Sequence, residues 1–120
     1  MKNQLGNAIC IPVKKDTPSI NTAKITELLG ELDGWNVDLE HDEPRLFKQY
    51  RFKNFREAMA FSVQIAEIAD QQDHHPSILV EWGKVSIWWW THAIHGLHQN
   101  DFIMAAKTDL LYQAFNKNIP

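Results

Sequence analysis

Five of the six histidines in this chain of 120 residues lie between positions 74 and 98. Histidine donates and accepts protons near neutral pH, because an unperturbed imidazole titrates at about 6.5. Such a cluster indicates acid–base catalysis as the first chemistry to consider. The sixth histidine lies in the polar segment His41-Asp42-Glu43-Pro44 and is interpreted as a solvent-exposed turn residue.

The most specific arrangement within the cluster is the segment Asp73-His74-His75-Pro76. A proline disfavours helical backbone at the residue before it, so a helix that precedes Pro76 must end near His75. Both imidazoles can then project from the junction between that helix and the following strand.

A third imidazole, that of His92, is predicted to join this pair from the other strand of a hairpin. Two strand-like runs, residues 77–82 and 84–91, are separated by Gly83, which permits a tight turn. In a hairpin, the end of the second strand lies beside the start of the first. The sequence therefore predicts three imidazoles at one end of a sheet.

The elements that must position these imidazoles follow from the periodicity of the apolar residues. Residues 1–19 have no clear periodicity and are predicted to form an extended, partly mobile arm. Residues 20–120 are predicted to form a single domain, because a chain of this length builds one hydrophobic core. Helical patterns begin near residues 21, 54 and 98 and alternate with two hairpins. The order α-β-β-α-β-β-α favours an α+β fold, a four-stranded antiparallel sheet with three helices packed on one face.

The helix predicted to begin after Asn54 carries two apolar rows. One row passes through Phe55 and Met59, and the other passes through Phe61 and Ile65. Burial in the core is the favoured explanation of the second row, ahead of an oligomer contact.

The run Trp88-Trp89-Trp90 alternates across a predicted strand, so Trp89 faces one side of the sheet and its neighbours face the other. Packing in the core or at a sheet-mediated interface is the favoured explanation. The alternative is that one ring forms a wall for a flat ligand.

Composition and charge exclude several classes of partner. The formal net charge of -3, without a basic stripe, argues against nucleic acid. No stretch approaches the roughly 18 apolar residues that span a bilayer, so no membrane partner is expected. The apolar run at residues 8–13 is too short for a signal peptide, and the lone Cys10 fits a reducing compartment, so a cytoplasmic location is expected.

A longer pattern connects these residues across most of the chain. Its parts are Asp70, His74-His75-Pro76, Trp82-Gly83-Lys84-Val85, Thr91-His92, Gly96-Leu97 and Asp101, with Phe-Lys-x-Tyr-x-Phe-Lys-x-Phe at residues 47–55. This pattern resembles the signature of the pterin-4a-carbinolamine dehydratases, and details such as Glu81-Trp82-Gly83-Lys84 resemble the bacterial members. The resemblance extends from about Thr22 to Phe115.

The resemblance implies an activity and a set of site residues. The activity is dehydration of 4a-hydroxytetrahydrobiopterin, or a related hydroxypterin, to the quinonoid dihydropterin, which needs an acid and a base and neither a metal nor an organic cofactor. It belongs to the recycling of the pterin cofactor of aromatic amino acid hydroxylation. The resemblance makes His74 and His92 the preferred general acids and His75 the substrate-orienting residue. Further substrate contacts are expected from Pro76, Thr91, His92, Ala93 and Ile94.

Two acidic residues are expected to support the acid–base chemistry. By resemblance, Asp101 lies near the pocket and orients a histidine. Its position in the first turn of a predicted helix also allows a purely structural explanation, interaction with the helix dipole. Asp70 stands where many relatives carry an acid, usually glutamate, and Asn100 stands where many carry a basic residue.

Two other functions compete with this one. His92, His95, His98 and Asp101 have the side-chain types that bind zinc or iron, although Gly96 interrupts a continuous helical face. The same fold also serves some relatives as a binding or assembly protein, including partnership with a transcription factor or an influence on phenylalanine hydroxylase. A homodimer or homotetramer is expected in either case, because antiparallel sheets leave edge strands.

Overall fold

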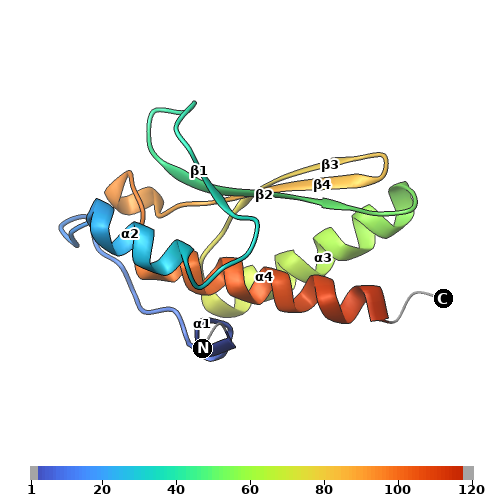
Figure 1. The fold of residues 1–120 in the computed structure, drawn as a ribbon, viewed down its shortest axis with the longest axis horizontal. Helices are drawn as coiled ribbons and strands as arrows, with labels where there is room; N and C mark the ends of the chain where they lie inside the picture. Colours follow the sequence, from blue (N-terminus) through green and yellow to red (C-terminus); the bar gives the residue numbers. More distant parts are fainter. Residues whose placement is uncertain (1–2, 118–120) are drawn as a thin grey trace.

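The computed structural model describes residues 3–117, which form one antiparallel sheet covered on one face by helices (Figure 1). The elements are α1 Asn3–Asn7, α2 Thr22–Leu29, β1 Asn36–Asp38, β2 Arg45–Arg51, α3 Phe55–Gln72, β3 Ser77–Glu81, β4 Lys84–Trp89, the 3-10 turn η1 His92–Ile94, and α4 Gln99–Lys117. The predicted α+β class and the predicted order from α2 to α4 are confirmed. The structure adds α1 ahead of them, in the arm for which no element was predicted.

The sheet has the strand order β1-β2-β4-β3, and every neighbouring pair is antiparallel. Glu81 lies opposite Lys84, and Gly83 between them has φ +75°, a left-handed conformation that glycine adopts without steric cost. Ser77 lies opposite Trp88, so the start of β3 is beside the end of β4. This register carries the segment after β4 back to the segment before β3, as the hairpin prediction requires.

Helix α3 begins and ends with side-chain and backbone caps. The Asn54 side chain accepts a hydrogen bond from Glu57 N at 2.9 Å, as expected from the sequence. At the other end Asp73 has φ 52°, and His74 N donates to Ala69 O at 3.1 Å. This is a Schellman-type ending in which an aspartate occupies the left-handed position usually taken by glycine.

The second apolar row of α3 lies in the core, as predicted, because Phe61 and Ile65 are fully buried. The residues of the first row differ in burial. Ala58, which also belongs to this row, is fully buried, whereas Phe55 and Met59 are 47% and 42% exposed. Helix α3 therefore buries one face and leaves an apolar strip on the other.

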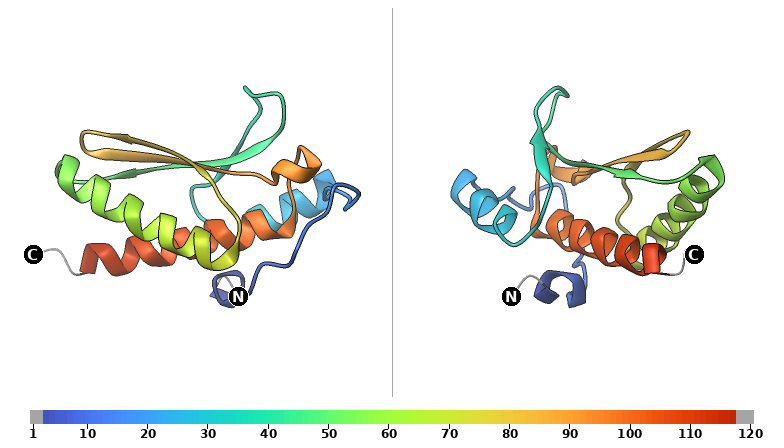
Figure 2. Two further views of the ribbon diagram at one scale, coloured as in Figure 1. Left: turned by 180° about the vertical axis from the view of Figure 1, so that it is seen from behind. Right: turned by 45° about the vertical axis from the view of Figure 1, so that its right-hand side comes forward.

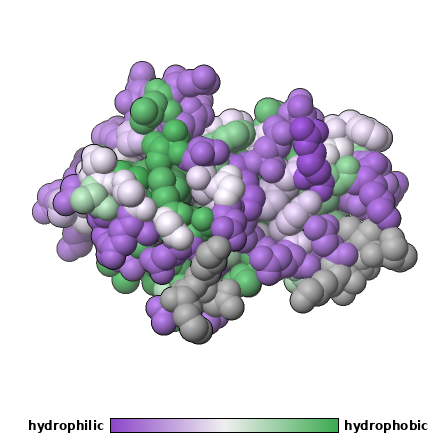
Figure 3. Space-filling view, viewed as in Figure 1, coloured by the Kyte–Doolittle hydropathy of each residue, from purple (hydrophilic) through white to green (hydrophobic). Residues whose placement is uncertain are grey.

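Two predictions near the start of the domain need correction. The apolar spacing of Ile25, Leu28, Leu29 and Leu32 predicts a helix as far as Leu32, but α2 ends at Leu29 and is followed by a tight turn in which Leu32 N donates to Leu29 O. The alternation of Trp35, Val37 and Leu39 predicts that Leu39 lies on the buried face of a strand, but β1 ends at Asp38 and Leu39 is 74% exposed. Apolar surface is visible between the β1–β2 connection and α2 in Figure 3.

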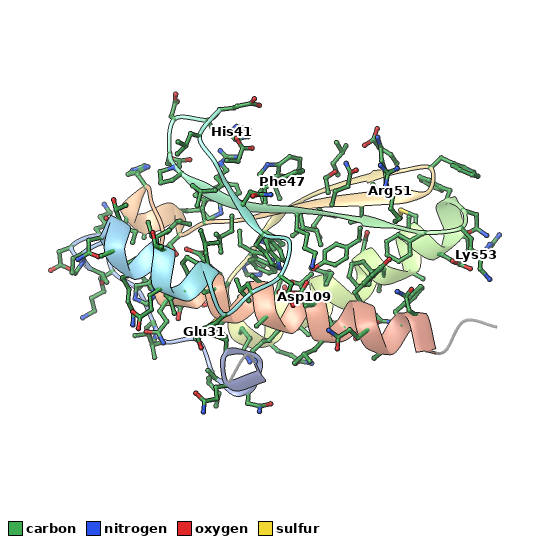
Figure 4. The ribbon with its side chains drawn as sticks, in the orientation of Figure 1. Glu31, His41, Phe47, Arg51, Lys53 and Asp109 are labelled. Atoms are coloured by element: carbon green, nitrogen blue, oxygen red, sulfur yellow. The ribbon has the colours of Figure 1, made fainter. Side chains whose placement is uncertain are left out.

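A buried polar cluster joins α4 to the sheet around Asp109, which Figure 4 labels beneath the strands. Its carboxylate accepts hydrogen bonds from Lys48 Nζ at 2.8 Å, Tyr50 Oη at 2.5 Å and Trp35 Nε1 at 3.1 Å. Burial raises the pKa of the Tyr50 phenol, which therefore donates rather than ionises. The cluster fixes α4 against β2.

None of the helices within residues 3–117 combines the length and the apolar character needed to cross a membrane.

Candidate functional site

A pocket of about 350 Å³ lies where the end of α3, the end of β4 and the N-terminal arm meet. The predicted residues that line it are His74, His75, Thr91, His92 and Ala93. The structure thus brings the three predicted imidazoles to one cavity. Pro76 and Ile94 are next to lining residues in the chain but do not line the pocket themselves, and Asp70 and Asp101 contact its histidines from outside it.

Asp101 is completely buried and its carboxylate accepts three hydrogen bonds. His74 Nε2 lies 2.6 Å from Oδ1, while Thr91 Oγ1 and the backbone N of His98 donate to Oδ2 at 2.8 and 2.9 Å. A buried carboxylate is stable when its lone pairs are satisfied in this way. Since an ionised carboxylate only accepts, the hydrogen between Asp101 and His74 belongs to His74 Nε2.

The same carboxylate begins helix α4. His98 Nδ1 accepts a hydrogen bond from Asn100 N at 3.0 Å, and Asp101 Oδ2 accepts one from His98 N. This is the reciprocal pattern of a capping box, with a histidine and an aspartate in place of the usual residues. Asp101 therefore has two contacts at once. It caps the start of α4, as the structural explanation states, and it also contacts a histidine of the pocket.

His74 is held on three sides. The left-handed Asp73 ends α3 and directs the next residue toward the sheet, and Asp101 holds Nε2. The imidazole also stacks on the Trp89 indole, with ring centres 5.9 Å apart and planes at 10°. With Nε2–H donated to Asp101, Nδ1 is the ring nitrogen available for proton exchange.

His75 and His92 are more exposed than His74. The Nε2 atom of His75 lies 3.0 Å from Asp70 Oδ1, so the short aspartate side chain reaches it. The Nε2 atom of His92 lies 3.4 Å from the His75 carbonyl oxygen, and its ring lies 4.3 Å from the Trp90 ring. The two histidines are therefore neighbours through the hairpin register.

Trp88, Trp89 and Trp90 do not line this pocket, as far as the described residues 3–117 show. Trp89 is fully buried and its Nε1 donates to Thr108 Oγ1 at 3.1 Å. Trp88, on the other sheet face, donates to Asp38 at 2.9 Å. Trp88 and Trp89 therefore pack as the favoured explanation expects, and none of the three rings forms a wall of this pocket.

The residues proposed as metal ligands are not gathered into a metal site. His98 caps α4, and His95 is 82% exposed with Nδ1 3.3 Å from Glu43 Oε2. Among residues 3–117, no three side chains of His, Cys, Asp or Glu are arranged to hold a metal ion.

The sequence analysis missed the contribution of the arm. Residues 10–13 line the pocket, and so do Gln72 and Asn100, which bond to the arm backbone. Burial raises the pKa of the Cys10 thiol to about 11, so it is protonated at neutral pH and Sγ lies 3.8 Å from Asn100 O. No sequence signal indicated this contact, because Asn100 was noted only for standing where many relatives carry a basic residue.

His98 leads to a prediction about stability and pH. Burial lowers its pKa, an effect that Asp101 opposes and His74 reinforces. Because the unfolded chain then takes up a proton at a higher pH than the folded one, folding stability is complete above about pH 6.5 and falls as the pH drops toward the lower folded pKa.

His98→Asn keeps an acceptor for Asn100 N without a titrating group. The free energy of unfolding of this variant, measured with urea between pH 7.5 and 5, should fall less than that of the wild type. Parallel curves for the two proteins would contradict the assignment of His98 as a neutral cap.

The fold and the site define an α+β protein with a histidine pocket at one end of its antiparallel sheet, the class of the pterin dehydratases. Residues 18–111 match the family model described as pterin 4 alpha carbinolamine dehydratase, and the chain belongs to this family. A relative from Chlorobium luteolum, named "Putative pterin-4-alpha-carbinolamine dehydratase", is 44% identical over 92% of this chain and 96% of its own length. A similarly named relative from Gloeobacter violaceus is 47% identical over 85% and 88%.

Solved structures agree on the fold. The crystal structure of a transcriptional coactivator/pterin dehydratase from Brucella melitensis matches with a TM-score of 0.72 and 28% identity, over 78% of this chain and 98% of that one. A pterin dehydratase-like RuBisCO assembly factor of the alpha-carboxysome has a TM-score of 0.55 at 24% identity, over 65% and 88%, which shows a shared fold alone. The family and the names of these relatives support pterin carbinolamine dehydratase activity.

Proposed function

We propose that this protein dehydrates 4a-hydroxytetrahydrobiopterin, or a related 4a-hydroxytetrahydropterin, to the quinonoid dihydropterin and water. The carrying observation is the pocket in which three imidazoles meet, with a fully buried carboxylate behind one of them. In this reaction the 4a-hydroxyl oxygen gains a proton, the C4a–O bond breaks and water leaves. N5 loses its proton, and the electron pair of that bond forms the C4a–N5 double bond. One acid and one base complete the step.

The proposed division of roles follows the contacts of each histidine. His74 and His92 serve as general acids toward the 4a-hydroxyl. When His74 Nδ1 carries the proton, its partner carboxylate lies 2.6 Å from Nε2 and balances the charge. His75, held by Asp70, orients the substrate.

Further substrate contacts are proposed along the segment that follows β4 and at the start of β3. They are assigned to Thr91, Ala93, Ile94 and Pro76. The Thr91 hydroxyl donates to Asp101, so the methyl group is the part of this side chain that would contact the substrate.

The physiological context is proposed from the chemistry of the product. A quinonoid dihydropterin must be reduced before it can serve again as a hydroxylase cofactor, which supports a place in pterin recycling for aromatic amino acid hydroxylation. A functional link to phenylalanine hydroxylase and a cytoplasmic location belong to the same proposal.

The deciding experiment is a direct dehydratase assay with chemically generated 4a-hydroxytetrahydropterin, after subtraction of the spontaneous reaction. We expect catalysis above the spontaneous rate at neutral pH. An unchanged rate with folded protein at micromolar concentration would refute the activity.

A binding or assembly role is the second candidate, favoured by apolar side chains on the surface. Val63 of α3 is 53% exposed, Leu79 of β3 is 47% exposed, and Trp82 in the β3–β4 turn is 72% exposed. Large apolar side chains exposed at the surface favour contact with another protein when they form a patch. A pure binding role would survive replacement of the pocket histidines, whereas the dehydratase role would not.

The same surface predicts a homodimer or homotetramer. Val63 and Met59 lie on the exposed strip of α3, and β1 and β3 are the edge strands of the sheet. Light scattering after gel filtration should give two or four times the chain mass of 13.9 kDa. Val63→Glu should shift the mass toward the monomer, whereas Glu27→Gln, an exposed substitution on α2 and outside this strip, should not. A monomeric wild type at micromolar concentration would contradict the prediction.

A further inference from the structure

The N-terminal arm, blue in Figure 2, passes beside the start of α4 on its way from α1 to α2. Residues 10–13 line the same pocket as the three imidazoles. Three of these four residues, Ile11, Pro12 and Val13, have apolar side chains, and Ile11 is 59% exposed.

Asn100 holds this part of the arm through both polar atoms of its side-chain amide. Its Oδ1 accepts a hydrogen bond from Ile11 N at 3.0 Å, and its Nδ2 donates to Ile11 O at 2.7 Å. Asn100 is only 2% exposed. Gln72, the last residue of α3, adds a third bond, from Cys10 N to Oε1 at 2.9 Å. The two helix ends that position His74 and Asp101 therefore also position the arm.

The arm is attached independently at both of its ends. On one side Leu5 is buried and Lys107 Nζ donates to Gly6 O at 2.9 Å. On the other side Ile20 N donates to Leu97 O at 3.0 Å. Loss of the Asn100 bonds should therefore loosen residues 10–13, which only the Cys10–Gln72 bond of the three then holds, while α1 and α2 stay in place.

We propose that residues 10–13 form a substrate-contacting wall of the pocket, and that Asn100 is the positioning residue that holds this wall against the bound pterin. The inference rests on the proposed function and adds a specificity element to it. Aliphatic side chains suit the face of a flat heteroaromatic ring, and a wall held by backbone hydrogen bonds need not be ordered at each binding event. The wall should contribute to KM more than to kcat, because its aliphatic side chains bind the ring and transfer no proton.

Cys10 provides a direct measure of the wall, since it is the only cysteine of the chain. Its thiol has a pKa of about 11 against an ordinary 9.0. Alkylation by iodoacetamide requires the thiolate, so release of the wall in Asn100→Ala should speed labelling at pH 8, by up to roughly 100-fold. Biopterin, a stable oxidised pterin, should slow labelling of the wild type. Asn116→Ala, an exposed substitution near the other end of α4, should label like the wild type.

Kinetics complete the test. Asn100→Ala should raise KM roughly tenfold with a smaller change in kcat, as expected for loss of contact with one aliphatic side chain. Ile11→Ala keeps the backbone bonds to Asn100, so it should raise KM while Cys10 labelling stays slow. This second variant carries the test if Asn100→Ala fails to fold.

The outcomes separate the wall from the activity. Slow labelling in folded Asn100→Ala, or unchanged KM in both variants, would overturn the wall while leaving the dehydratase proposal intact. A wild type without dehydratase activity would refute the proposed function. In that case protection of Cys10 by biopterin that is lost in Asn100→Ala would still support a pterin-binding wall, and absence of protection would overturn it.

Discussion

The double variant His74→Ala/His92→Ala should lose catalysed dehydration by roughly 1,000-fold or more, toward the spontaneous rate. General acid–base groups contribute about 100- to 10,000-fold, and two acids that replace one another hide part of that contribution in single variants. Each single substitution should therefore cost about 100-fold or less. The measurement is kcat/KM with chemically generated substrate, corrected for the uncatalysed reaction.

The control for this experiment is His41→Ala. His41 is exposed in the β1–β2 connection, where its Nε2 lies 3.4 Å from Asp38, and it does not line the pocket (Figure 4). It should retain the wild-type rate. His75→Ala should chiefly raise KM, since an orienting residue acts on substrate binding. Normal turnover in the double variant, with its fold verified by circular dichroism, would remove both histidines from the mechanism.

Asp101→Asn should lower kcat by up to roughly 100-fold, the most that loss of His74 alone is expected to cost, with a smaller change in KM. The carboxylate accepts from His74 Nε2, Thr91 Oγ1 and His98 N, and the amide can replace only one of its oxygens as an acceptor. If the amide nitrogen faces His74, it donates to Nε2 and the single hydrogen of the neutral ring lies on Nδ1. That neutral ring is a far weaker acid than the imidazolium, whose charge the amide does not balance as the carboxylate does. Steady-state kinetics and a nitrogen NMR spectrum of the imidazole would report both changes.

A matched control distinguishes this effect from simple loss of stability. Asp109 is the other acidic residue of α4 that binds buried polar groups, and it lies away from the pocket. Asp109→Asn should lower the melting temperature, because Tyr50, Lys48 and Trp35 lose part of their acceptor, and it should leave kcat near the wild-type value. Equal kcat losses in the two variants would show that Asp101 acts through stability alone.

Local signals in the sequence were sufficient to predict most of the fold. The Asn54 cap, the turn at Gly83 and the apolar period of α3 act over a few residues, and each lies where it was predicted. The meeting of three imidazoles followed from the hairpin register. The end of α2 was misplaced because Leu32 continues the helical period, although the chain has already turned after Gly30.

The arm could not be predicted in the same way. Its contacts join residues about 60 to 100 positions apart, such as Cys10 to Gln72 and Gly6 to Lys107, and such pairs leave no periodic pattern. An asparagine that bonds to a distant backbone has the same appearance in a sequence as one on the surface. The roles of Asp70 and Asp101 also depended on side-chain direction, which spacing alone does not specify.

The capping box at Asp101 also bears on how this position can change during evolution. A variant that loses the carboxylate loses the contact with His74 and also leaves the His98 N–H without its partner at the start of α4. A lineage that no longer needed the catalytic activity would therefore still be selected to keep an acidic or capping residue here, because the helix needs it to fold. Retention of Asp101 in a relative is thus weak evidence for activity. Retention of His92 is the more informative marker, because its side chain is exposed, packs beside the Trp90 ring and lies near the His75 backbone, and caps no helix among residues 3–117 by a side-chain bond.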